Sequence, residues 1–414
     1  MSSTPRHGGM TAVEDVRALV LNGLSPLPGV DVDLEAAVGL VCAVDVVARE
    51  PIPGFANSSM DGFALRADDT RPSGATLTVT GTILAGATPT PAVGPGEAVR
   101  IMTGAPLPEG ADAVCRSEDA DAREGVVTVP ALERGVYVRG RGDDTRVGDT
   151  LVTAGDVVRP WHVGTLAAQG LRRVTVHPRP VVGVLSTGDE LVEGPSPLPA
   201  GKIRDVNRPA LLATLAAEGV ASRDLGRVGD DPGPIADRLR SAVTECDVVV
   251  TTGGVSVGDV DFVKSVLVEL AGESARWLQV AVRPGKPFAF ALVGSTPVFG
   301  LPGNPVSTLV SFELFVRPTL RALAGHRDVT RPRVSALTDC DLPRTPDGKL
   351  HVVHVETRVH DDGRLHIERA AREGSHLLSA LAGTNALALV PDGVGPTAGG
   401  EVDVLVTGPV MSGA

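Results

Sequence analysis

A chain of 414 residues with 43% apolar residues and a net charge of −12 is long enough for several globular domains. Its acidic balance argues against a general nucleic-acid-binding protein, because neutralising phosphates requires basic patches. There is no apolar run of about 18 residues and no secretory leader pattern, so we expect a cytoplasmic protein without a membrane segment. The four cysteines are far apart and form no Cys-x-x-Cys pair, which predicts neither a zinc site nor a disulfide framework.

The beginning of the chain predicts a short tail followed by a helical region. Residues 1–10 are polar and should form a disordered tail. Residues 11–52, joined by residues 143–178, are expected to form a helical linker domain, because apolar residues recur there at helical spacing. The expected helices cover residues 11–21, 34–42 and 160–170.

Residues 53–142 consist of short β-rich runs between Gly and Pro turns, which predicts an all-β domain. Asp61 is either a turn residue before a strand or a ligand for a cation or a polar ring. Thr103 either bonds a substrate or stabilises its own turn. Asp144, just beyond this domain, lies in a loop that is either solvated or placed beside a metal. The expected strands are residues 77–81, 97–102, 113–116 and 125–129.

Residues 179–327 alternate between strand-like and helix-like patterns, which is typical of a doubly wound α/β domain. Asn304 and Pro305 suit the cap and first position of its last helix, and Pro318 should kink that helix. The expected strands are residues 181–185, 247–250, 288–293 and 297–300. The expected helices are residues 209–218, 234–245, 261–271 and 305–323.

Three glycine-rich loops directly follow strands of this domain. Loops that follow parallel strands open at one edge of the sheet, where ligands bind. Glycine lets the backbone approach a ligand closely, and loop N–H groups favour anions. The carboxylates of Glu190 and Asp261 suggest a metal cation beside the anion, although helix capping is an alternative for one of Asp259 and Asp261. We therefore predict a phosphate-bearing ligand. The loops are Ser186-Thr187-Gly188-Asp189-Glu190, Gly253-Gly254-Val255-Ser256 with Asp259 and Asp261 beyond it, and Pro302-Gly303-Asn304-Pro305.

Arg283-Pro284-Gly285-Lys286-Pro287 places two cations around a rigid turn. Arg offers a planar fork and Lys a point charge, and both suit phosphate or another oxyanion. A solvated basic turn is the alternative. No His-Glu-x-x-His, Gly-x-Ser-x-Gly, Gly-x-Gly-x-x-Gly or Walker A motif is present, which disfavours zinc-dependent or nucleophilic hydrolysis and dinucleotide or P-loop chemistry.

Residues 328–410 are again rich in β-like runs. The expected strands, residues 352–359, 365–368 and 386–390, suggest a small β-barrel. The fold class expected from the whole chain is therefore α/β and multidomain. A central doubly wound domain is accompanied by an all-β domain, a helical N-terminal region and a C-terminal barrel.

Together, these motifs resemble the molybdopterin molybdenumtransferase family, which includes MoeA and the gephyrin E domain. They occur in family order, and the resemblance covers residues 11 to 408. The motifs are Ser59-Met60-Asp61-Gly62, Ile101-Met102-Thr103-Gly104-Ala105-Pro106, Gly110-Ala111-Asp112-Ala113-Val114, Ser186-Thr187-Gly188-Asp189-Glu190-Leu191, Gly253-Gly254-Val255-Ser256-Val257-Gly258 with Asp261, Pro284-Gly285-Lys286-Pro287, and Leu301-Pro302-Gly303-Asn304-Pro305-Val306-Ser307.

The resemblance implies an elongated, four-domain homodimer whose central domain binds molybdopterin. It implies an enzyme that converts adenylylated molybdopterin and molybdate to molybdenum cofactor and releases AMP, with Mg²⁺ as the metal. A molybdopterin adenylyltransferase and recipient molybdoenzymes are candidate partners.

The resemblance also assigns roles to residues. Asp61, Glu190 and Asp261 would hold Mg²⁺, and Arg283 and Lys286 would hold phosphate or molybdate. The family's functional positions fall on Asp61, Thr103, Asp144, Glu190, Asp261, Arg283, Pro302, Pro305 and Ser375. Substrate contacts from the loops would add Ser186, Thr187, Gly188, Gly253, Gly254, Ser256 and Asn304.

The chain departs from the family pattern at two positions. Gln279 stands where a lysine is expected, and His354 aligns with an expected arginine. Both changes remove a fixed positive charge from near the proposed oxyanion site, which bears on the affinity for molybdate and on the choice between molybdate and tungstate.

Two other functions fit parts of the sequence. A molybdopterin adenylyltransferase would resemble the central domain alone, so the additional domains disfavour it. A non-catalytic carrier or scaffold is the other alternative. A carrier or scaffold would not need the acidic residues of the site, so their presence favours catalysis.

Overall fold

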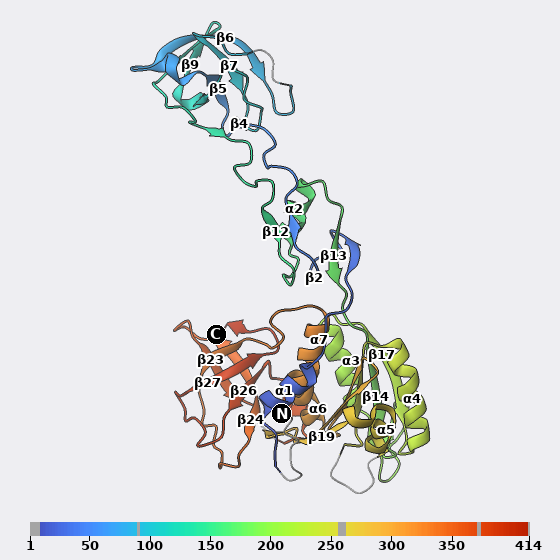
Figure 1. The fold of residues 1–414 in the computed structure, drawn as a ribbon. Helices are drawn as coiled ribbons and strands as arrows, with labels where there is room; N and C mark the ends of the chain where they lie inside the picture. The colour runs from blue at the N-terminus through green and yellow to red at the C-terminus, as the bar shows by residue number, and fades with distance from the viewer. Residues whose placement is uncertain (1–8, 89–91, 256–261, 371–373, 413–414) are drawn as a thin grey trace. The chain divides into compact units, whose positions relative to one another are not determined.

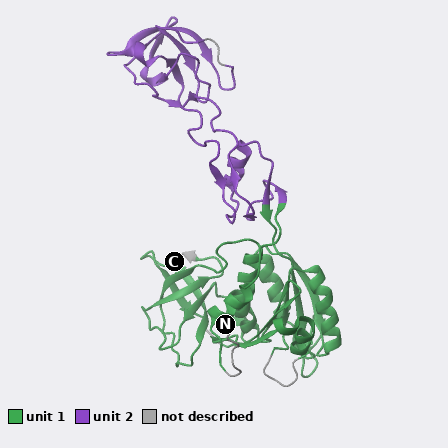
Figure 2. Ribbon diagram, in the orientation of Figure 1, with its two compact units in different colours: residues 1–30, 176–414 green, residues 31–175 purple. Residues whose placement is uncertain are grey.

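The computed structural model describes residues 9–88, 92–255, 262–370 and 374–412. The chain divides into two compact units (Figure 2). The inserted unit is the continuous segment Asp31–Thr175, and the main unit combines residues 1–30 with residues 176–414.

A six-stranded sheet in the inserted unit confirms the all-β prediction for this region. Its strand order is β8-β5-β7-β6-β10-β9. Phe63, Leu65 and Leu77 are buried on one face of the sheet, where alternate strand residues form a core. The elements are β5 (Gly62–Leu65), η1 (Ala67–Thr70), β6 (Ala75–Ile83), β7 (Glu97–Ile101), β8 (Ala113–Arg116), η2 (Ser117–Asp119), β9 (Asp121–Arg123) and β10 (Val126–Val129).

The segments expected to form a helical domain are mostly strands and turns. The expected helix over residues 34–42 is wrong, because residues 34–39 form turns and Val41–Cys42 is strand β2. Its local backbone bonds are those of turns, such as Leu40 N to Ala37 O at 2.9 Å, and other groups bond to distant segments, as Gly39 N donates to Val158 O at 2.9 Å. The short strands here are β1 (Val30–Asp33), β3 (Val46–Val47), β4 (Asn57–Ser58), β11 (Val138–Arg139), β12 (Thr150–Val152) and β13 (Arg173–His177).

The two other helices expected in these segments are confirmed as α1 (Val13–Leu21) and α2 (Pro160–Ala168). Helix α1 belongs to the main unit, where Val13, Val16 and Val20 are buried in the core of the α/β domain. No helix among the described residues is both long and apolar enough to cross a bilayer.

The predicted α/β domain is confirmed as a sheet with the order β17-β14-β18-β22-β21-β19. The first four strands are parallel, and β21 pairs antiparallel with both of its neighbours, β22 and β19. One hydrophobic cluster joins the sheet to α1, α3 and α6, and another joins it to α4 and α5, so helices cover both faces (Figure 1). The strands are β14 (Val182–Thr187), β15 (Leu191–Val192), β16 (Ile203–Arg204), β17 (Ser222–Val228), β18 (Val248–Thr252), β19 (Arg276–Gln279), β21 (Pro287–Val293) and β22 (Thr296–Leu301). The helices are α3 (Asn207–Ala217), α4 (Pro232–Glu245), α5 (Phe262–Ala271), η3 (Gly272–Ser274), α6 (Pro305–Ser311) and α7 (Arg317–Leu323).

A π-helical turn, η4 (Phe312–Val316), separates α6 from α7 next to Pro318, where a kink was predicted. Proline has no N–H to donate to the carbonyl four residues earlier, which belongs to Leu314. Arg17 Nε on α1 donates to Leu314 O at 3.4 Å. The N-terminal helix therefore donates a hydrogen bond to the Leu314 carbonyl, which receives none from Pro318.

Five strands in the order β24-β25-β23-β27-β26 form the predicted C-terminal barrel, which closes because β26 pairs back with β24. A short strand of the preceding domain, β20 (Val282–Arg283), runs parallel to β24 and places Arg283 opposite His351. This pairing joins the α/β domain to the barrel. The barrel elements are β23 (Arg333–Thr338), β24 (Leu350–Val359), β25 (Leu365–Arg369), η5 (Leu378–Leu381), β26 (Ala386–Val390), β27 (Glu401–Val406) and β28 (Met411–Ser412).

Candidate active site

The three glycine-rich loops meet at one edge of the α/β sheet. They follow β14, β18 and β22, which are neighbouring parallel strands and therefore end at the same edge. Gly253 N donates to Leu301 O at 3.2 Å, and Asn207 Nδ2 donates to Gly303 O at 2.7 Å. The loops therefore start at one edge of the sheet, and their convergence on a single ligand pocket stays a prediction.

Close packing explains why glycine occupies these loops. Gly253 has a φ of +87°, and a Cβ added to it would lie 2.4 Å from Thr187 O of the neighbouring loop. Gly188 has a φ of +145°, and its Cβ would lie 2.6 Å from the Glu190 carboxylate. Residues with a side chain rarely adopt this backbone conformation, so only glycine fits both positions without a shift.

Replacing Gly253 with alanine should destabilise the protein more than replacing Gly226 with alanine. Both positions have positive φ, which alone costs alanine about 1 kcal/mol or more. Only Gly253 has backbone in the way, because nothing lies within 4 Å of a Cβ at Gly226. Denaturant unfolding of the two variants measures the difference. Equal loss of stability would contradict the close approach of Gly253 to Thr187.

The side chains of Ser186 and Thr187, predicted to bind substrate, are buried at the end of β14. Ser186 Oγ lies 3.3 Å from Thr252 Oγ1, and Thr187 Oγ1 donates to Thr252 O at 3.3 Å. These hydroxyls bond within the sheet, so a ligand at this edge would meet the loop backbone. Ser256 and Asp261 lie outside the described residues, and their roles stay predictions.

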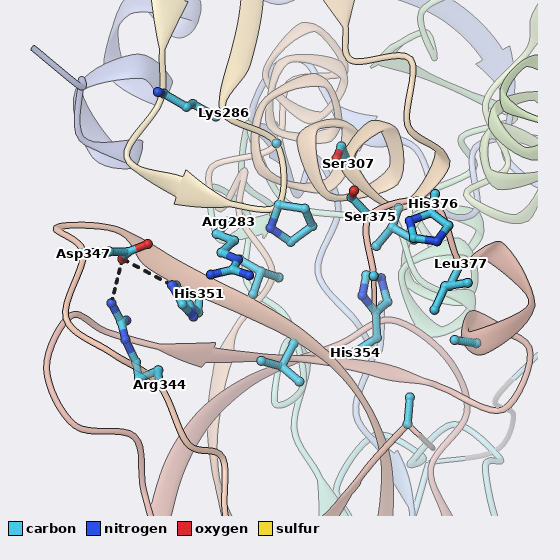
Figure 3. A pocket seen from close by; sticks show the side chains of 18 of the residues that line it. Arg283, Lys286, Ser307, Arg344, Asp347, His351, His354, Ser375, His376 and Leu377 are labelled. Atoms are coloured by element: carbon cyan, nitrogen blue, oxygen red, sulfur yellow. Dashed lines mark hydrogen bonds and ion pairs between the residues drawn. The ribbon is translucent and has the colours of Figure 1, made fainter. Parts of the chain in front are cut away.

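A pocket of about 910 Å³ lies between the α/β domain and the barrel (Figure 3). Arg283 at the end of β20 and Lys286 in the turn after it contribute to the pocket lining, and Ser375 contributes from the opposite domain. The pocket therefore brings together three residues that the sequence assigned to the site. His354, one of the two departures from the family pattern, also lines the pocket, whereas Gln279 does not.

One cation of the pocket, Arg344, already forms ion pairs with neighbouring carboxylates. Its side chain is only 1% exposed and donates to Asp347 at 3.1 Å and to Asp392 at 2.6 Å. A hydrogen bond from Lys349, and a weaker contribution from His351, lower the pKa of Asp347 to about 2. Asp347 therefore remains anionic, and its charge is balanced within this group of neighbours.

Arg283 and Lys286 are different, because both are exposed and neither side chain bonds another described residue. Figure 3 shows the Arg283 guanidinium beside His351, in agreement with their register on β20 and β24. Two unpaired cations at a pocket favour an anionic ligand. This uncompensated positive charge is the clearest electrostatic feature of the pocket.

Asn304 connects the loop edge to the pocket. It stands at the cap position of α6, but its side chain makes no capping bond, and Asn304 Nδ2 instead donates to Ser375 Oγ at 3.2 Å. Pro305 occupies the first turn of α6, as predicted. Pro302 O accepts a bond from Thr308 Oγ1 at 2.5 Å, which fixes the third loop against the helix.

Within the inserted unit, the structure brings Asp61 and Thr103 together. Asp61 Oδ1 accepts bonds from Thr103 N at 2.7 Å and from Thr103 Oγ1 at 2.8 Å. The backbone bond, reinforced by the hydroxyl, lowers the pKa of Asp61. Asp144 is exposed on another loop of this unit, where its Oδ2 accepts a 3.4 Å bond from Thr145 Oγ1.

Sequence reasoning named Ser375 and His354 but missed the rest of the wall that the barrel contributes to the pocket, including Arg344, Asp347 and His351. A weak signal was available, because Asp347-Gly348 is a typical turn dipeptide and stands just before strand β24. That turn alone gives no reason to expect a ligand. The pairing of β20 with β24 is what makes these residues part of the pocket.

Comparison with known proteins covers all the regions described above. Residues 11–170 match the MoeA N-terminal region (domains I and II), residues 183–322 a probable molybdopterin-binding domain, and residues 341–407 the MoeA C-terminal region (domain IV). The molybdopterin molybdenumtransferase of Haemophilus influenzae is 36% identical over 95% of this chain and 97% of its own length. The chain belongs to the molybdopterin molybdenumtransferase family. It is a transferase of molybdenum-cofactor biosynthesis.

Other members of the family agree with this assignment. Molybdopterin molybdenumtransferase 1 of Mycobacterium tuberculosis is 36% identical over 95% of this chain and 98% of its own length. The crystal structure of the molybdopterin biosynthesis MoeA protein from Pyrococcus horikoshii matches with a TM-score of 0.82 and 27% identity. That match covers 96% of this chain and 100% of the other, so the similarity extends beyond the central domain.

Proposed function

We propose that this molybdenumtransferase converts adenylylated molybdopterin and molybdate to molybdenum cofactor and releases AMP. The observation that carries the proposal is the pocket with two exposed cations, Arg283 and Lys286, whose side chains bond none of the residues that the structure describes. Molybdate is a divalent oxyanion, and phosphate groups carry similar charge. Both suit the planar fork of arginine and the point charge of lysine.

The loop edge would hold the anionic part of the organic substrate. Gly188, Gly253 and Gly254 have no side chains of their own to keep a phosphate from the loop backbone. Asn304 and Ser375 would orient polar groups between this edge and the pocket, because their bond links the two features. The loops, Arg283 and Lys286 would thus position the substrates without a covalent intermediate on the enzyme.

We propose Mg²⁺ as the activating ion. Bound Mg²⁺ would polarise the phosphoanhydride whose cleavage by water releases AMP. Glu190 is the candidate ligand in the main unit, because its carboxylate is exposed and Mg²⁺ prefers oxygen donors. Asp61 of the inserted unit is a candidate in its own right for the same reason. The lowered pKa of Asp61 keeps this carboxylate ionised and suitable for a cation.

The resemblance of the motifs to the family further supports a homodimer as the working form. It also supports a molybdopterin adenylyltransferase as the source of substrate and molybdoenzymes as recipients of the product. Light scattering on the purified chain tests the dimer, and a monomer at working concentration would contradict it.

Incubating the purified protein with adenylylated molybdopterin, Mg²⁺ and molybdate should release AMP and leave molybdenum bound in cofactor form. Chromatography measures AMP, and metal analysis after desalting measures retained molybdenum. Reactions without molybdate or Mg²⁺ are the controls. AMP release with no retained molybdenum, or no AMP release at all, would contradict an insertase.

A further inference from the structure

A cluster of two histidines and two aspartates lies at one end of the barrel. Asp339 directly follows β23, His360 directly follows β24, His366 is on β25, and Asp362 is in the turn between the last two strands. None of the four lines the pocket described above. The cluster is therefore separate from the residues assigned to the reaction.

The contacts within the cluster are close. His366 Nδ1 lies 2.7 Å from Asp339 Oδ1, and His366 Nε2 lies 3.1 Å from Asp362 Oδ2. The His360 and His366 rings are stacked, with centroids 4.0 Å apart and planes at 6°. His360 Nε2 lies 3.9 Å from Asp339 Oδ2, so the Asp339 carboxylate faces both rings.

This arrangement cannot be satisfied by a neutral His366. A neutral imidazole has one N–H and one lone pair, yet both ring nitrogens of His366 face carboxylate oxygens. Placing the proton on Nε2, where it bonds Asp362, leaves the Nδ1 lone pair against Asp339 Oδ1. A cation between those two atoms removes the conflict, and the cation is either a second proton or a metal ion.

We propose that Asp339, His360 and His366 bind a divalent zinc-class cation on the barrel. Possible ligand atoms of the three residues all lie within 4.8 Å of one another, which is close enough to share one ion once the exposed His360 ring turns out of its stack with His366. Two imidazoles and one carboxylate are a ligand set typical of Zn²⁺, and a water molecule would complete four-coordination. Mg²⁺, which prefers oxygen ligands, suits this set poorly.

Asp362 would support the site without binding the metal. Its bond with His366 Nε2 fixes the proton on that nitrogen and points Nδ1 toward Asp339. Carboxylates commonly orient a metal-binding histidine in this way. The side chain of His366 is 15% exposed and that of Asp339 is 41% exposed. His366 is therefore held in place by its surroundings, and Asp339 beside it is accessible to an ion from solvent.

The bound ion would connect the ends of three barrel strands. Asp339, His360 and His366 come from β23, β24 and β25, so one ion would restrain all three elements together. Because the folded barrel presents the ligands as a group, Zn²⁺ should raise the temperature of thermal unfolding. The ion is expected to affect stability and not to take part directly in molybdenum transfer.

Zinc titration calorimetry on the chelator-treated full chain tests the proposal. We expect one Zn²⁺ per chain and a higher unfolding temperature with Zn²⁺. His360→Ala and Asp339→Asn should each weaken this binding at least about tenfold, in line with losses seen for metal-site residues. Asp361→Asn is the matched control, because Asp361 is an exposed aspartate of the same turn outside the cluster. Its Zn²⁺ affinity should match that of the parent.

Cobalt absorption spectra add a readout of the ligands themselves, since Co²⁺ in place of Zn²⁺ reports loss of an imidazole. His366→Ala is the further variant, and circular dichroism checks that each variant is folded. The absence of a single site in the parent would overturn the proposal. Equal Zn²⁺ affinity in the parent, His360→Ala and Asp339→Asn would also overturn it. So would a loss of Zn²⁺ affinity in Asp361→Asn as large as the loss in those two variants.

Discussion

Arg283→Ala should raise the molybdate concentration that gives half-maximal AMP release by about tenfold or more. Arg283 is an unpaired cation at the pocket, and a hydrogen bond to a charged group contributes about 1.5–3 kcal/mol. Each 1.4 kcal/mol is about a factor of ten in affinity, and screening by solvent at an open pocket favours the lower end of that range. Initial rates measured against molybdate concentration provide the test.

The matched control is Arg276→Ala, which removes the same charge from the same domain. Arg276 is exposed on β19 and does not line the pocket, so its loss should leave half-saturation by molybdate within about twofold of the parent, a difference of about 0.4 kcal/mol. If Arg283→Ala matched Arg276→Ala, Arg283 would have no part in binding the oxyanion.

Replacing His354 with arginine, the residue expected from the family pattern, should lower the molybdate concentration that gives half-maximal AMP release. His354 lines the pocket, and His354→Arg would add a fixed positive charge and a planar fork there. Gln279→Lys is the comparison, because Gln279 is exposed at the end of β19 and is not part of the pocket lining. We expect a lower half-saturating concentration in the first variant and a smaller change in the second. Unchanged molybdate dependence in His354→Arg would make this departure neutral.

Asp61→Asn should slow AMP release by about 100-fold or more at limiting Mg²⁺. Removing one group that stabilises charge in a transition state typically costs a factor of about 10²–10³. Asparagine keeps an oxygen that can accept both bonds from Thr103, so the local structure should survive while the negative charge is lost. Single-turnover measurements separate this effect from substrate binding.

Asp121→Asn is the control for Asp61→Asn, since Asp121 is an exposed aspartate of the same sheet that pairs with Arg123. Its rate should equal that of the parent. Thr103→Val should give an intermediate loss, because the backbone bond to Asp61 remains while the hydroxyl bond is removed. A parental rate in Asp61→Asn would exclude Asp61 as a metal ligand in the rate-limiting step.

The α/β sheet was largely predictable because its central strands are buried. Val182–Thr187 and Val248–Thr252 are buried throughout, and such strands appear in a sequence as continuous apolar runs. Strand β17 (Ser222–Val228) was missed, since it lies at the sheet edge and is mostly polar and exposed. Because these strands could be located in the sequence, the loops that directly follow them could be located as well.

The pocket was only half predictable for a different reason. The Arg283–Lys286 turn is local in sequence and carries its own signal. The opposite wall depends on Val282–Arg283 pairing with Leu350–His351, which no local pattern indicates. The failed helix over residues 34–42 has a similar cause, because backbone bonds to distant residues outweighed its local periodicity.

The bond between Arg17 and Leu314 spans 297 residues of chain. At about 5–20 residues per second, a ribosome needs on the order of tens of seconds to make that stretch. Meanwhile the continuous segment Asp31–Thr175 emerges whole and can complete its own core. Helix α1 leaves the ribosome before everything it packs against. Nascent chains of this protein should therefore expose the apolar face of α1 to chaperones until synthesis is well past the α/β domain.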